Sequence, residues 1–182
     1  MKSIKSKIIL AINPGARYLG VAVFENGQPQ FWQVKSIKMN QPPRERISDA
    51  KEIVQKLIDY YEPGILAIQK PKPHWLKQSR LLDKIIKAIK DTARDNKMKV
   101  KEFMQEEIRK AICGNIKATK KEMAEVLRQK FPKLRVLLDL NKIKDRYWEH
   151  LVGAMILADV AKFELRGNIL LNQNKISELV KL

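Results

Sequence analysis

The sequence is poor in several residue types, and each shortage excludes a class of protein. Its 182 residues include a single cysteine, Cys113, so an internal disulfide is impossible and a reducing compartment is expected. No apolar run approaches the roughly 20 residues that a membrane-spanning helix needs. The first residues, Met-Lys-Ser-Ile-Lys-Ser-Lys, lack the apolar segment and cleavage site of a signal peptide. We therefore expect a cytoplasmic protein that makes no contact with a membrane.

Acidic residues are scarce relative to basic ones. Against 37 Lys and Arg the chain has only 20 Asp and Glu, which gives a formal net charge of +17 and an isoelectric point near 10.0. A charge of this sign and size favours a polyanionic partner, and nucleic acid is the first candidate. A lysine-rich source proteome or an acidic protein partner would give the same composition.

The apolar residues that are present predict one mixed α/β domain. A hydrophobic content of 45% over 182 residues is enough for a well-buried core. The apolar periodicity predicts an antiparallel meander followed by parallel strands, with residues 1–165 forming the domain and 166–182 a tail or accessory helix. The expected elements are strands at 8–12, 20–24, 30–34, 65–68 and 99–103, helices at 44–61, 74–96, 105–112, 119–130 and 145–165, and an extended segment at 134–140.

The first two strands form a predicted hairpin that organises the chain. The apolar run at 8–12 breaks at Asn13-Pro14-Gly15, where proline fixes φ and glycine permits a tight turn. The second strand leads into Asn26-Gly27, a strong hairpin signal. The hairpin therefore places one polar side chain, that of Asn13, at the carboxyl end of a buried strand. The apolar run at 65–68 ends in the same way, at Gln69.

Four segments carry a family resemblance when they are taken together. They are residues 11–15 with Gly20, the strand at 66–69, the Gly-Asn loop that opens a helix within 112–120, and the helical segment at 150–158. In this order they resemble the ribonuclease-H-like nucleases, and in particular the RuvC-type Holliday-junction resolvases. The resemblance implies a mixed five-stranded sheet flanked by helices, a role in DNA recombination or repair, and a homodimer.

The resemblance also identifies four positions that have lost their acids. In active relatives these acids hold two Mg²⁺ ions about 4 Å apart, which activate water and stabilise the leaving oxygen. Here the positions hold Asn13, Gln69, His150 and Gly153. Neutral side chains leave the repulsion between two Mg²⁺ ions uncompensated, so neither cleavage nor a cofactor is expected. Asn and Gln alone are also used to trap uncleaved substrates, but His150 and Gly153 are not such replacements, which favours a natural loss.

An active nuclease remains the alternative. Glu149 lies one helical turn before Gly153, and Asp145 lies another turn earlier, so these acids are weak candidates for a displaced Mg²⁺ site in a crossover junction endonuclease. Both acids also suit the start of a helix, where the positive end of the dipole stabilises them without any metal. A third interpretation is a non-enzymatic scaffold that has kept the fold.

Basic and aromatic side chains predict how nucleic acid, branched or duplex DNA in particular, would be bound. Lysines and Trp75 follow the strand at 65–68, and Trp75 could stack on an unpaired base or pack in a core or interface. The loop at 114–115 offers backbone N–H groups and cations at a helix start, which suits either a phosphate or a plain tight turn. Residues 145–148 form a further cation–aromatic cluster. The predicted nucleic-acid-binding residues are Arg17, Lys70, Lys72, Trp75, Lys77, Arg80, Asn115, Lys117, Lys120 and Lys121.

Overall fold

A computed structural model describes residues 7–70, 80–135 and 145–179 of the protein, with side chains up to Lys162. The strands are β1 (Ile8–Pro14), β2 (Tyr18–Glu25), β3 (Gln28–Ser36), β4 (Ile65–Gln69) and β5 (Lys99–Phe103). The helices are α1 (Pro43–Tyr61), α2 (Arg80–Asp95), α3 (Gln105–Cys113), α4 (Lys120–Lys130), the short 3₁₀ helix η2 (Pro132–Leu134) and α5 (Arg146–Leu179). Within this part of the chain, none of the helices combines the length and the apolar character that crossing a bilayer requires.

The five strands form one mixed sheet in the order β3-β2-β1-β4-β5. β1, β2 and β3 form the predicted antiparallel meander, and β4 and β5 are added in parallel beside β1. The turn between β2 and β3 is the predicted Asn26-Gly27 pair, whose φ angles of 51° and 79° match the left-handed geometry of a tight hairpin. The predicted mixed sheet, an antiparallel meander with parallel strands added, is therefore confirmed.

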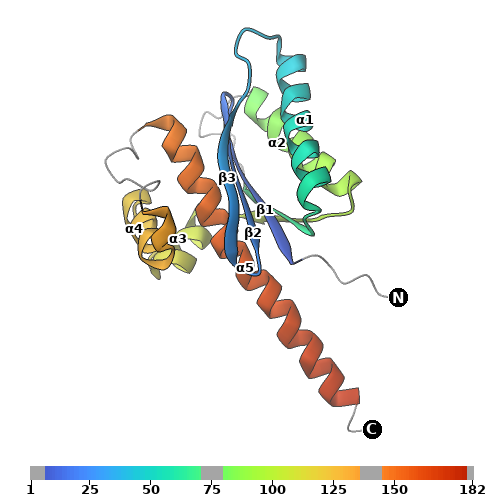
Figure 1. Ribbon diagram of the computed structural model, residues 1–182, viewed down its shortest axis with the longest axis vertical. Helices are drawn as coiled ribbons and strands as arrows, with labels where there is room; N and C mark the ends of the chain where they lie inside the picture. Colours follow the sequence, from blue (N-terminus) through green and yellow to red (C-terminus); the bar gives the residue numbers. More distant parts are fainter. Residues whose placement is uncertain (1–6, 71–79, 136–144, 180–182) are drawn as a thin grey trace.

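Helices cover both faces of this sheet (Figure 1). α1 and α2 pack on one face, against alternate residues such as Leu10 and Ile12 of β1. α5, with α3 and α4, packs on the other face, against Ile9 and Ala11. β1 is thus buried on both sides, as its uninterrupted apolar run indicates.

Local signals explain most helix boundaries. Thr119 caps α4 as predicted: its Oγ1 accepts a hydrogen bond from the Glu122 N–H at 3.2 Å, and the Glu122 carboxylate accepts one from the Thr119 N–H at 2.6 Å. The predicted end of α5 at Leu165 is wrong, because the helix continues through Gly167 to Leu179 and runs past the end of the sheet (Figure 1). A single interior glycine costs a helix only about 1 kcal/mol and need not end it.

Two further predictions fall partly or wholly outside the described residues. Leu134, predicted as the start of an extended segment, instead ends the 3₁₀ helix η2, and residues 136–144 are outside the described part. α2 begins at Arg80, and the six predicted helical residues before it also lie outside.

Candidate nucleic-acid interface

The four positions that resemble a nuclease site meet at one cavity. β1 and β4 are parallel neighbours, so Asn13 and Gln69 reach the same edge of the sheet, and α5 crosses that edge with His150 and Gly153. Together these side chains and the α5 backbone line a cavity of about 240 Å³. The four residues therefore lie together in the structure. Other residues that line the cavity include Lys70, Gln105, Lys120 and Glu149.

Asn13 and Gly153 share one space inside the cavity. A Cβ atom added at Gly153 would lie 2.0 Å from Asn13 Nδ2 and 2.7 Å from Asn13 Cγ, far inside contact distance. The Asn13 amide also donates a hydrogen bond of 3.4 Å to the backbone carbonyl of His150. The Asn13 amide thus packs against the α5 backbone and fills the space that a Cβ atom at position 153 would occupy.

His150 lies against two glycines of the first hairpin. A Cβ at Gly15 would come within 2.5 Å of the imidazole Cε1, and a Cβ at Gly20 would come within 1.9 Å of the His150 carbonyl oxygen. The imidazole Nδ1 is buried and has no hydrogen-bond partner among the described residues. Burial lowers the pKa of His150, and this effect outweighs the nearby Glu149 charge, so the neutral imidazole is favoured.

Gln69 is paired with a second amide. Its Nε2 donates a 2.6 Å hydrogen bond to Oε1 of Gln105, the first residue of α3. The sequence analysis did not select Gln105. Its position just after β5 was the available signal, because β5 runs parallel to β4 and ends at the same edge of the sheet.

Glu149 forms an ion pair with Lys120, which is the first residue of α4. Burial raises the pKa of the Glu149 carboxyl, but the hydrogen bond and charge of Lys120 outweigh it, so the pKa lies below its usual range. Asp145 does not line the cavity; its carboxylate accepts a 2.9 Å hydrogen bond from the Tyr147 N–H at the start of α5. Among the described residues, no three or more His, Cys, Asp or Glu side chains lie close enough together to hold a metal ion.

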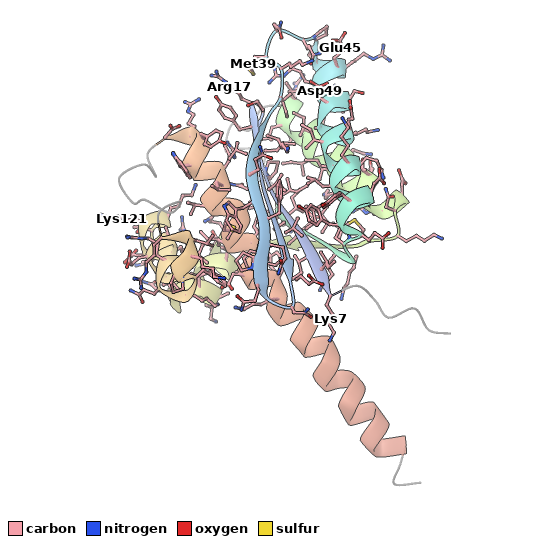
Figure 2. All side chains as sticks on the ribbon, in the orientation of Figure 1. Lys7, Arg17, Met39, Glu45, Asp49 and Lys121 are labelled. Carbon is pink, nitrogen blue, oxygen red and sulfur yellow. The ribbon has the colours of Figure 1, made fainter. Side chains whose placement is uncertain are left out.

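The predicted basic residues lie at and around this edge. Lys70 and Lys120 line the cavity, and Arg17 is exposed on the β1–β2 turn at the end of the sheet near the start of α5 (Figure 2). Asn115 closes its own turn, because its side-chain oxygen accepts a 2.9 Å hydrogen bond from the Lys117 N–H. Lys117, Lys121 and Arg80 are exposed, and Lys72, Trp75 and Lys77 lie outside the described residues.

Known proteins share this architecture. Residues 9–143 match the family model described as crossover junction endodeoxyribonuclease RuvC. A comparison with curated proteins finds no match.

Three solved structures superpose on the chain, each over 87% of its length. Thermus thermophilus RuvC gives a TM-score of 0.66 at 19% identity over 95% of that chain. T. thermophilus RuvC in complex with Holliday junction substrate gives 0.67 at 21% identity over 94% of that chain. The yeast mitochondrial Holliday junction resolvase Ydc2 gives 0.56 at 8% identity over 78% of that chain. The ribonuclease-H-like fold predicted from the sequence is confirmed, and, as the family model covers most of its length, the chain belongs to the RuvC family.

Proposed function

We propose that this protein binds branched DNA, such as a four-way junction, without cleaving it. The observation that carries the proposal is the cavity at the end of β1 and β4, where all four positions of the family's acids hold neutral groups. A relative with the same fold is described in complex with a Holliday junction substrate, which supports junction DNA as the ligand.

The donor set of the cavity does not suit a pair of Mg²⁺ ions. Mg²⁺ prefers carboxylate oxygens and demands near-octahedral geometry, and a two-metal site needs several such ligands. Among the described residues that line the cavity, Glu149 is the one carboxylate, and its negative charge is balanced by Lys120. The amides of Asn13 and Gln69 are instead engaged with protein partners. We therefore expect DNA binding that needs no divalent metal.

Basic groups around the cavity would hold the DNA backbone. Lys70 lines the cavity, and Arg17 extends from the adjacent turn. Contacts of this kind position a duplex or a junction through phosphates and carry no sequence information. The net charge of +17 adds a long-range attraction for any polyanion. We also propose a homodimer, on the family resemblance alone, which light scattering of the purified protein would test.

The deciding experiment measures binding and cleavage side by side. A labelled four-way junction, a duplex with the same arm sequence and a single strand are incubated with the protein in EDTA, Mg²⁺ or Mn²⁺. We expect the junction to be bound most tightly, with binding retained in EDTA and with no cut product in either metal. Metal-dependent cutting would overturn the proposal, and failure to bind any of the three DNAs would favour a scaffold.

The second candidate function is an endonuclease with displaced acids, and one observation favours it: Glu149 does reach the cavity. If it serves as a metal ligand, Glu149→Gln abolishes any cutting that is seen, whereas Asp145→Asn, which removes an acid outside the cavity, does not. If no cutting is detected with either metal, this candidate fails.

A further inference from the structure

An aromatic cluster extends from the cavity rim and has no part in the cavity itself. Tyr18, at the start of β2, meets Tyr147, in the first turn of α5, edge to face with ring centroids 6.1 Å apart. Tyr147 meets Trp148 in the same way at 5.8 Å. Three rings from two distant parts of the sequence thus gather at one end of the molecule.

The outer ring of the cluster remains accessible. Tyr147 is 37% exposed despite its two ring contacts. A cation accompanies the rings, because the guanidinium of the exposed Arg17 lies 5.1 Å from the centroid of Tyr18. An exposed aromatic ring beside a guanidinium is suited to a flat, electron-rich partner, since both groups stack on π-systems.

The cluster is continuous with the cavity. The Tyr18 ring lies 6.3 Å from the imidazole of His150, which lines the cavity. The cavity and the cluster therefore form one continuous surface that a DNA strand could contact. Backbone and base would contact adjacent surfaces of the protein.

We propose that Tyr147, supported by Tyr18 and flanked by Arg17, is a stacking site for an unpaired nucleobase. The site rests on the proposed DNA binding and adds a class of ligand to it, because a paired base inside a duplex has both faces covered by its neighbours. Only a base that is unstacked, as at a strand crossing or in a single strand, presents a free face. Base–aromatic stacking of this kind is tolerant of sequence.

The test separates the base from the phosphates. A labelled thymidine oligonucleotide and an abasic oligonucleotide of equal length and charge are titrated with the wild type and with Tyr147→Leu. We expect the substitution to weaken binding of the thymidine strand by roughly 5- to 140-fold, the range that stacking of one base supports. The abasic strand should bind both proteins equally. Tyr147→Trp should restore the affinity for thymidine.

Tyr60→Leu is the matched control, because Tyr60 is also exposed, at 78%, but lies near the end of α1. It should leave both affinities unchanged. Arg17→Met provides a second variant on an exposed turn, and it should weaken thymidine binding more than abasic binding.

The outcomes distinguish a failure of the stacking site from a failure of the proposed function. If the wild type fails to bind a four-way junction, the proposed function fails. If the junction is bound but Tyr147→Leu leaves thymidine binding intact, or weakens thymidine and abasic strands equally, the stacking site is overturned while the proposed function stands.

Discussion

Asn13 and Gly153 lie so close together that a substitution at one position affects the packing of the other. The Asn13 amide occupies the space in which a Cβ at position 153 would begin. Restoring an acid at position 153 would therefore require Asn13 to move first. An acid at position 153 would thus change the packing of the cavity as well as its charge.

A double-mutant cycle tests that fit. In the wild type, Gly153→Ala should lower the free energy of unfolding by about 1–3 kcal/mol, because the new methyl group overpacks against Asn13. In an Asn13→Ala background the same substitution should be neutral or stabilising, since alanine is the better helix former by about 1 kcal/mol. Urea denaturation of the four proteins measures the coupling. Additive effects would mean that the two residues do not share one space.

The half-buried imidazole of His150 predicts a dependence of stability on pH. Burial holds the folded-state pKa of His150 below its ordinary value of 6.5, with Glu149 opposing the shift and Lys120 adding to it. Between the folded-state pKa and 6.5, the unfolded chain binds a proton at His150 and the folded protein does not. The stabilising contribution of the neutral imidazole is therefore complete above pH 6.5 and is lost as the pH falls through the folded-state pKa. The free energy of unfolding is measured above pH 6.5 and again at acidic pH. It should fall less between the two for His150→Gln than for the wild type. His74 stays in both proteins, and an equal loss would contradict the assignment.

The convergence of the four cavity residues was predictable, and their contacts were not. Asn13 and Gln69 follow buried strands, and parallel strands end at one edge, so their proximity follows from topology. The contact between Asn13 and Gly153 depends on how closely α5 approaches β1, which no local pattern records. Gln105 was missed for a similar reason, because its partner Gln69 lies on β4, far from it in the sequence.

At the scale of elements, the glycines of the first hairpin determine how closely α5 lies on the sheet. A Cβ at Gly20 would collide with the backbone of α5 itself. Gly20 is therefore a point of close approach inside β2, whereas the sequence shows only a glycine before an apolar run. The Asn26-Gly27 turn and the Thr119 cap were predicted correctly because each signal lies within four residues. The end of α5 was not, because Gly167 gave a local signal that the helix overrides.

A buried ion cluster joins α4 to α5 through residues that do not line the cavity. Asp159 of α5 is fully buried, and its carboxylate accepts hydrogen bonds of 2.6 Å from Lys130 of α4 and from Lys162. Burial lowers the pKa of Lys162, and the hydrogen bond to Asp159 opposes this shift. The cluster therefore couples two helices that both line the cavity.

Asp159→Asn should be among the more damaging single substitutions in the protein. It removes the carboxylate that both ammonium groups contact, and breaking a buried ion pair costs about 3–5 kcal/mol. Glu52→Gln is the control, because the Glu52–Lys56 pair on α1 is exposed to solvent and should contribute little to stability. Chemical denaturation measures both. Equal effects of the two substitutions would contradict the structural role given to Asp159.

For the whole molecule, charge supplies attraction and the cavity edge supplies position. A net charge of +17 draws DNA to the protein wherever the individual cations lie. It does not select one surface, whereas the proposed binding of a junction requires that the DNA contact a particular surface. The distinction can be measured, because a contact with phosphate releases counterions and a distant charge does not.

Lys70→Gln should therefore change the salt dependence of junction binding. Lys70 lines the cavity. The logarithm of the association constant falls linearly with the logarithm of the salt concentration, and each lost phosphate contact should reduce the steepness of this line by about 0.9. Lys56→Gln removes the same charge from the exposed face of α1 and should leave the slope unchanged. Fluorescence anisotropy of a labelled junction over a salt series gives both slopes. If the slope becomes less steep by the same amount in both variants, the binding depends on the overall charge of the protein. The cavity edge is then not part of the interface.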